Sequence, residues 1–203
     1  MHAVHDARPH GRRRHHARGQ HLRLRGGALV ILIAGVGYQY LGDLSFGPKL
    51  VERLQDMTWP EEVRVEDFGY GPLAILDWFE ESPGKRFERA ILAGAVERGR
   101  EPGTLTTYSW IAGAPDPELV QERILEAGAG VISLENLLIV AQHFGALPAD
   151  TSVVELEPVE KEWNTELSPL GEERLEQAVE WIQREVHSGA RPSGNGRKEV
   201  RNG

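Results

Sequence analysis

Residues 28–50 read ALVILIAGVGYQYLGDLSFGPKL, an apolar run of strand length that breaks at a glycine-rich turn and resumes as a helix. A short run rich in β-branched residues and bounded by glycine is typical of a strand that a parallel sheet buries on both faces. Open α/β sheets bind ligands beyond the carboxyl ends of their strands. We therefore expect a functional site in the turn between Gly35 and Gly47.

The composition is that of an ordinary globular domain. The chain has 203 residues, of which 40% are hydrophobic and 27% charged, and it contains no cysteine. The lack of cysteine excludes thiolate catalysis and zinc fingers, and nothing indicates an oxidising compartment, so we expect a cytoplasmic protein. The apolar run is shorter than the ~20 residues that span a bilayer, so we expect no membrane partner.

The charge divides the chain into a basic arm and an acidic body. Residues 1–27 contain seven arginines, one aspartate and six of the eight histidines, so they carry +6 and the rest of the chain carries −14. An acidic body argues against nucleic acid as a partner of the folded domain. The arm has no apolar periodicity and is predicted to be disordered. It could be a secretory or twin-arginine signal, a tail that binds metal or nucleic acid, or a solvated extension from an early start codon.

The order of the remaining patterns predicts an α/β fold. Strands are expected at 63–67, 90–96 and 152–156, and alternation in 104–110 indicates a further, antiparallel strand. Helices are expected at 48–57, 73–79, from 116 to the glycines at 128 and 130, at 131–144, and from Ser168 to about 186. The prediction is a three-layer α/β/α sandwich around a mostly parallel five-stranded sheet, formed by one domain over 28–187, with a disordered tail at 188–203.

Two common catalytic patterns do not fit. A dinucleotide fingerprint would need a third glycine where Tyr40 stands after Gly35 and Gly37. No G-x-S-x-G elbow exists, and outside the arm only His143 and His187 could serve as a base. We interpret His143 as a structural histidine, and His187 as complementing a helix dipole.

Acidic residues follow the first three predicted strands. Asp43, Asp67 and Glu97 could converge with a histidine to hold a divalent metal. Alternatively, Asp43 and Asp67 cap turns through their own backbone. The sequence leaves both interpretations open.

The pieces, in their order, resemble the hydrogenase maturation protease family over about residues 30–186. The segments that carry the resemblance are GVGYQYLGDLSFG, VRVEDFGYG, ILAGAV, EPGTL, HFGALP, VVELEPVE and LSP. The resemblance implies a five-stranded α/β/α sandwich that acts on the large-subunit precursor of a nickel-iron hydrogenase. Such proteases remove a C-terminal extension after nickel insertion, so the nickel belongs to the substrate and no resident cofactor is expected.

The resemblance also implies three metal-contacting positions, and this chain departs from the family at each. They correspond to Leu44 in the first loop, Gly94 at the end of the third strand, and about Ile132 before a later helix. None of these residue types ligates a metal. Candidate substitutes lie one to three residues away, at Asp43, Glu97 and Glu135.

Two hypotheses follow, and whether the chain is an enzyme stays open. The first is a diverged endopeptidase. The second is a non-catalytic adaptor or chaperone that binds a hydrogenase subunit or another assembly factor through the same cleft. Aromatic and aliphatic side chains in the first loop suit a protein-binding surface. The residues expected to line the cleft or bind the partner are Gly35, Gly37, Tyr38, Tyr40, Asp43, Leu44, Phe46 and Asp67.

Overall fold

The computed structural model describes residues 30–80, 87–111, 113 and 116–188. The arm and tail predicted to be disordered lie outside these residues, except for Ser188. The elements are β1 (Ile31–Val36), the 3-10 helix η1 (Gly42–Ser45), α1 (Phe46–Gln55), β2 (Val63–Asp67), α2 (Pro72–Glu80), β3 (Arg89–Ala95), β4 (Leu105–Ser109), α3 (Pro117–Gly128), α4 (Leu134–His143), β5 (Asp150–Leu156) and α5 (Pro169–His187).

The strands form one sheet in the order β2-β1-β3-β5-β4. The first four strands in that order run parallel, and β4 pairs antiparallel with β5 at the edge. The edge position leaves every residue of β4 at least partly exposed. The predicted fold class is confirmed, including the antiparallel strand.

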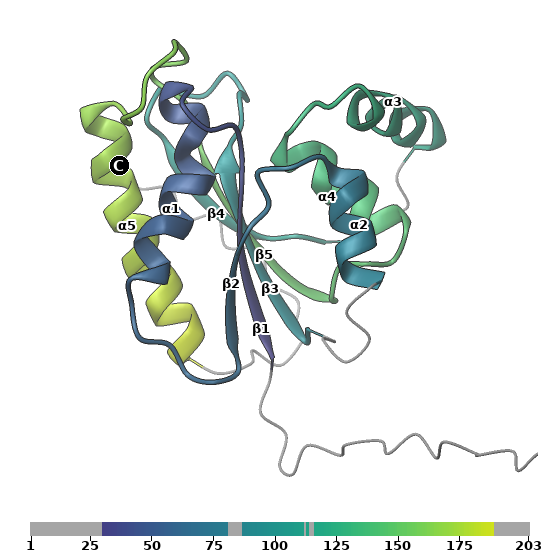
Figure 1. Ribbon diagram of the computed structural model, residues 1–203, viewed down its shortest axis with the longest axis horizontal. Coiled ribbons are helices and arrows are strands. Elements are labelled where there is room, and N and C mark those ends of the chain that lie inside the picture. Colours follow the sequence, from purple (N-terminus) through teal and green to yellow (C-terminus); the bar gives the residue numbers. More distant parts are fainter. Residues whose placement is uncertain (1–29, 81–86, 112, 114–115, 189–203) are drawn as a thin grey trace, which may run out of the picture.

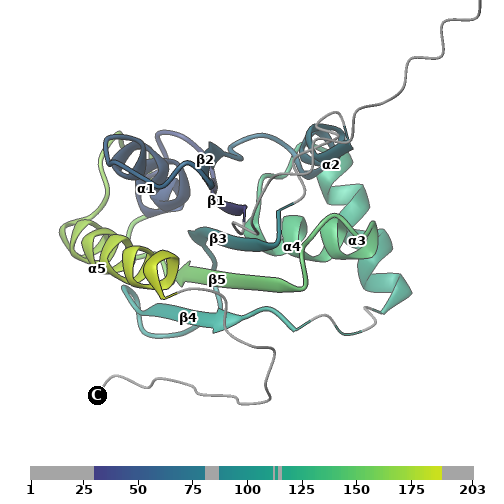
Figure 2. The ribbon, with the colours of Figure 1, turned by 90° about the horizontal axis from the view of Figure 1, so that it is seen from below.

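Helices cover both faces of the sheet, which makes three layers. Figures 1 and 2 show α1 and α5 on one face and α2 and α4 on the other. α3 packs against α4 and α2 rather than directly on the sheet. Each face has its own core, because alternate residues of every strand point to opposite sides. In β1, for example, Ile31 and Ile33 face α1 and α5, whereas Leu32 and Ala34 face α4.

Two helices begin at other residues than the sequence predicts. α1 begins at Phe46 rather than Pro48, because η1 leads directly into its first turn. α4 begins at Leu134 rather than near 131, because the Ser133 hydroxyl caps it by accepting a hydrogen bond from the Asn136 amide at 3.4 Å. Among the described residues, no helix has both the length and the apolar character needed to cross a bilayer.

A buried ion pair joins β3 to the end of α5. The Arg89 guanidinium donates to the Glu185 carboxylate, and at 2.7 Å to the Glu185 backbone carbonyl. Its Nε lies 3.6 Å from Asp150 on β5. Arg89 and Glu185 are both buried, so each charge depends on the other for the solvation it has lost.

We expect Arg89→Ala to lower the free energy of unfolding by about 3–5 kcal/mol, because it strips a buried carboxylate of its guanidinium. The matched control is Arg53→Ala, which removes an exposed ion pair with Glu176 between α1 and α5 and should cost less than about 1 kcal/mol. Urea unfolding followed by circular dichroism measures both. Equal losses in the two variants would contradict this assignment.

Candidate functional site

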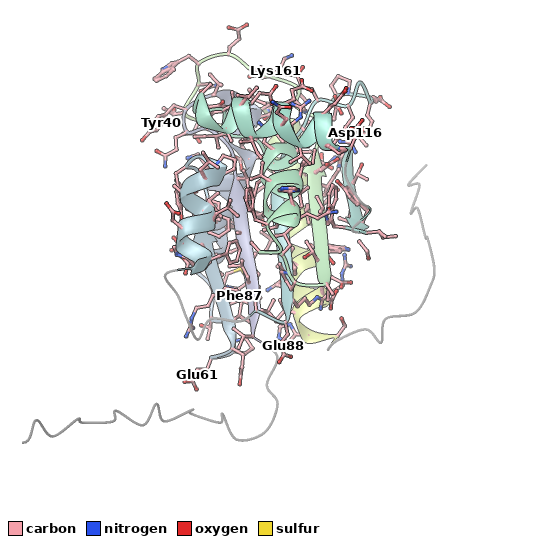
Figure 3. All side chains as sticks on the ribbon, turned by 90° about the vertical axis from the view of Figure 1, so that its right-hand side faces the viewer. Tyr40, Glu61, Phe87, Glu88, Asp116 and Lys161 are labelled. Carbon is pink, nitrogen blue, oxygen red and sulfur yellow. The ribbon has the colours of Figure 1, made fainter. Side chains whose placement is uncertain are left out.

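The carboxyl ends of β1, β2, β3 and β5 lie at one edge of the sheet, where the loops that follow them meet. We call residues 37–41 the first loop and residues 157–168 the second loop. Figure 3 places Tyr40 of the first loop and Lys161 of the second at this end of the molecule, and Glu61 and Glu88 at the opposite end. The predicted site therefore lies at the carboxyl edge.

Asp43 anchors the second loop. Its side chain is fully buried, and one carboxylate oxygen accepts hydrogen bonds from the backbone amides of Val159 and Glu160 at 2.8 and 3.1 Å. Ser168 donates twice, from its amide at 2.8 Å and from its hydroxyl at 2.9 Å. The carboxylate thus bonds a distant segment rather than its own turn, and it is not presented to a ligand.

Ser168 connects the Asp43 carboxylate to the N-terminus of α5. Its hydroxyl also accepts from the Gly171 amide at 2.9 Å, which caps the helix. Gly171 is required there, because a Cβ would lie 2.3 Å from the Asp43 carboxylate. A negative charge at a helix N-terminus also complements the helix dipole. One carboxylate therefore joins η1, the second loop and α5.

Glycines let α1 approach β1 closely. A Cβ on Gly35 would lie 2.1 Å from the Gly47 carbonyl oxygen, and one on Gly47 would lie 2.3 Å from that of Val36. A Cβ on Gly37 would meet the Leu44 carbonyl oxygen at 2.5 Å. These glycines serve backbone packing behind the first loop rather than an open ligand-binding turn.

Three further residues that were expected to line the cleft differ in burial and in contacts. Phe46 is fully buried between the sheet and α5, because α1 begins at this residue and turns its side chain inward; it lies in the core and not on the surface. Leu44 is half-buried. Asp67 accepts a hydrogen bond from the Gly69 amide at 2.7 Å. Asp67 therefore caps its own turn, which is one of the two interpretations that the sequence leaves open.

Tyr38 bridges the first loop to the segment before α4. Its hydroxyl accepts a hydrogen bond from the Ile132 amide at 3.1 Å. Gly94 is the last residue but one of β3: a Cβ there would lie 2.7 Å from the Val36 carbonyl oxygen and 3.1 Å from the Leu134 Cβ. The backbone at position 94 therefore has no room for a side chain without a shift of its neighbours.

The candidate metal substitutes do not come together. Asp43 is buried beneath the second loop, Glu97 pairs with Lys161 at 2.6 Å, and Glu135 pairs with Arg98 at 2.5 Å. Within the residues that the structure describes, no three histidine or acidic side chains are placed to hold a metal ion. The residues present do not fit a resident metal at this edge.

A charged cluster built on two buried glutamates, which the sequence analysis does not identify, lies at the same edge. Glu155 of β5 accepts hydrogen bonds from Arg98 at 3.0 Å, from Arg100 at 3.0 Å and from the Tyr108 hydroxyl at 2.7 Å. Glu157 accepts from the Arg98 amide at 2.9 Å and from the Arg100 Nε at 3.1 Å. The five residues of this cluster link β5 to β4 and to the loop after β3.

A sequence signal for the cluster exists. Arg98 and Arg100 are two residues apart after one predicted strand, and Glu155 and Glu157 are two residues apart at the end of another. Residues spaced by two along a strand share a face, and neighbouring parallel strands end at the same edge. Two pairs of opposite charge at such ends predict an ion-pair network.

The cluster shifts the pKa values of its members. Burial raises the pKa of Glu155, but hydrogen bonds from Arg98 and Tyr108 outweigh burial and hold it below the ordinary 4.5. Burial also raises the pKa of Glu157, but hydrogen bonds from the Arg98 amide and the Arg100 guanidinium outweigh burial and lower this pKa below its ordinary value. Burial first, and then the bond to Glu155, raise the pKa of the Tyr108 hydroxyl. Both glutamates are therefore carboxylates at neutral pH.

His143, interpreted as a structural histidine, is exposed. It lies at the end of α4, where the helix reaches solvent, with its ring against Phe144. It also lines a shallow apolar hollow of about 320 Å³ between α3 and α4. This hollow is formed by Pro117, Val120, Gln121, Ile124, Leu125 and His143.

Solved structures with this fold are known. The hydrogenase 2 maturation peptidase of a Thaumarchaeota archaeon is 26% identical, with a TM-score of 0.53 over 77% of this chain and 97% of that one. An Escherichia coli endopeptidase solved in solution is 26% identical, with a TM-score of 0.57 over 79% and 94%. The E. coli hydrogenase maturating endopeptidase HybD is 24% identical, with a TM-score of 0.58 over the same shares. No protein-family model and no curated protein matches the chain.

We expect Asp43→Ala to lower the free energy of unfolding by about 3 kcal/mol or more, because it leaves buried amide donors without an acceptor and weakens the α5 cap. The control is Asp67→Ala, which removes one local turn bond and should cost about 1 kcal/mol. Urea unfolding compares the two. A smaller loss for Asp43→Ala than for Asp67→Ala would contradict the anchoring role.

The charged cluster should make the fold sensitive to acid. Because the pKa values of Glu155 and Glu157 are lowered on folding, their stabilisation is complete above pH 4.5 and is lost as the pH falls through the lower, folded values. Glu155→Gln should be less stable at pH 7 but lose less stability between pH 5 and about 3 than the unaltered chain.

Glu97→Gln is the matched control for that experiment, because it removes the carboxylate of an exposed pair and should change stability at pH 7 by less than about 1 kcal/mol. Unfolding midpoints in urea, measured at each pH, give the comparison. An acid slope that is unaltered in Glu155→Gln would refute the assignment.

Proposed function

We propose that this chain, a structural relative of the hydrogenase maturation proteases, acts in the maturation of a nickel-iron hydrogenase in the cytoplasm by binding the large-subunit precursor or another assembly factor. The shared fold supports the role, because the relatives at 26% identity are an endopeptidase and a peptidase named for hydrogenase maturation. The binding surface is the carboxyl edge of the sheet, where such folds place their ligands.

The mode that the residues favour is binding without metal-dependent cleavage. The observation that carries this proposal is the state of the three positions to which the resemblance assigns metal contacts. Leu44 and Ile132 have aliphatic side chains, and Gly94 is crowded by backbone and by Leu134. The Ile132 amide donates a hydrogen bond to the Tyr38 hydroxyl of the first loop. No step of a metal-assisted reaction is assigned to these residues.

The edge retains polar groups, but they are engaged with one another. Arg98 is shared between Glu135 and Glu155, and Arg100 is shared between Glu155 and Glu157. A general base or a metal ligand needs a carboxylate that can reach the substrate. The cluster is instead an internal support that holds the loop after β3 in place.

A second mode is an endopeptidase that cuts by an altered route. The fold shared with known peptidases favours it, and Glu97 and Glu135 are its available carboxylates, because both side chains are partly exposed. The two modes differ in product, since only an endopeptidase shortens the precursor.

The test mixes the full chain with the nickel-loaded large-subunit precursor of its own hydrogenase. Calorimetry measures binding, and mass spectrometry measures the mass of the precursor. We expect a complex and a precursor of unchanged mass. A precursor that loses its C-terminal extension would favour the endopeptidase, and the absence of any complex would overturn the role in large-subunit binding.

A metal titration provides an independent check. Nickel and cadmium are added to the full chain after the six histidines of residues 1–27 are replaced by glutamine, so that the arm cannot mask the result. We expect no binding at micromolar concentration, because no described group of side chains is placed to hold an ion. If binding is found, its loss in Glu97→Gln or Glu135→Gln would locate a metal site and contradict the proposal.

A further inference from the structure

Two aromatic side chains lie side by side and exposed at the carboxyl edge. Tyr40, in the first loop, is 49% exposed, and Trp163, in the second loop, is 77% exposed. Their ring centroids are 6.1 Å apart, with 38° between the ring planes. We call these two residues the aromatic pair. Tryptophan and tyrosine are the residues most enriched where protein partners bind strongly.

The backbone holds the aromatic pair in position. The Asn164 amide donates to the Tyr40 carbonyl at 3.1 Å, and the Gly42 amide donates to the Asn164 carbonyl at 3.3 Å. Leu41 and Asn164 form a bridge between the two loops. Tyr40 itself has φ of 64°, in the left-handed region that side chains other than glycine rarely adopt. Strained backbone of this kind persists where its surroundings fix it, and it gathers at functional sites.

The second loop is acidic around Trp163. Glu160, Glu162 and Glu166 are exposed, and none of them forms an ion pair with any part of the chain that the structure describes. The lysine among them, Lys161, is neutralised by Glu97 at 2.6 Å. The aromatic pair is thus flanked by uncompensated negative charge.

We infer that the aromatic pair and the acidic second loop form the docking surface for an arginine-bearing segment of the partner protein. A guanidinium stacks on an aromatic face through cation-π attraction while its edge donates hydrogen bonds to carboxylates. This surface offers both features, with Tyr40 on the first loop and Trp163 and the carboxylates on the second. The inference rests on the proposed function for the identity of the partner, but not for the chemistry that the surface recognises.

The first experiment measures affinity of the full chain for the large-subunit precursor by calorimetry at low and high salt. Trp163→Ala should weaken binding about tenfold or more, because it removes the stacking face. Glu160→Gln with Glu162→Gln should weaken binding at low salt and flatten its salt dependence. Circular dichroism verifies that each variant is folded.

Matched controls come from outside the surface. Phe144→Ala removes another exposed aromatic, at the end of α4. Glu61→Gln with Glu88→Gln removes two exposed carboxylates at the opposite end of the molecule (Figure 3). Both should leave the affinity within about twofold. Unaltered binding by Trp163→Ala, with the precursor still bound by the unaltered chain, would overturn the docking surface and leave the proposed function standing.

A second probe separates the surface from the identity of the partner. A capped Arg-Leu-Arg peptide is titrated into the full chain, with capped Glu-Leu-Glu as the control, and the Trp163 indole is followed by NMR. We expect a saturable shift of the Trp163 indole resonance with the arginine peptide and no shift with the glutamate peptide. This result is expected even if the precursor does not bind. No shift would overturn the inference.

The basic arm of the chain is a competing occupant. Replacing Arg12, Arg13 and Arg14 with glutamine, with no peptide added, should leave the Trp163 indole resonance in place. A shift in that resonance would reject an external partner and assign the surface to the arm.

Discussion

The buried carboxylate of Asp43 is the constraint on which the carboxyl edge depends. A charge removed from water must find donors in the protein, and here every donor comes from the second loop or the start of α5. The loop after β5 therefore cannot move independently of the turn after β1. Through this connection a core interaction sets the position of side chains that lie on the surface, including Trp163.

Polar chemistry at this edge is divided into two kinds. The charged cluster around Glu155 is internally balanced, and its guanidiniums join strands and loops. The second loop, in contrast, presents carboxylates and the Trp163 ring to solvent. A site for chemical transformation would combine buried, shifted groups with access for a substrate. In this chain the two carboxylates whose pKa values are shifted, Glu155 and Glu157, are buried, and the carboxylates around Trp163 are exposed.

The fold could be predicted because it depends on local patterns. Buried strands, the alternation of β4 and the Ser168 cap of α5 are all visible within short windows of sequence. The role of Asp43 could not be predicted, because its carboxylate accepts hydrogen bonds from residues 116 to 125 positions away in the sequence. The expectation that Phe46 lines the cleft is wrong for a different reason. Helix α1 begins at Phe46, two residues before its proline, and this start turns the aromatic ring inward. Only the pairing of strands brings Arg98 beside Glu155.

Position 94 carries a consequence for how this surface can change over time. A side chain at Gly94 would press on the Leu134 Cβ and on the backbone of β1, two groups that substitution of neighbouring side chains does not remove. The nearer obstacle is the Val36 carbonyl oxygen at 2.7 Å, so a side chain at position 94 needs a shift of the β1 backbone whatever residue stands at 134. A single substitution at position 94 therefore places a ligand at the end of β3 only at the cost of displacing the backbone of β1.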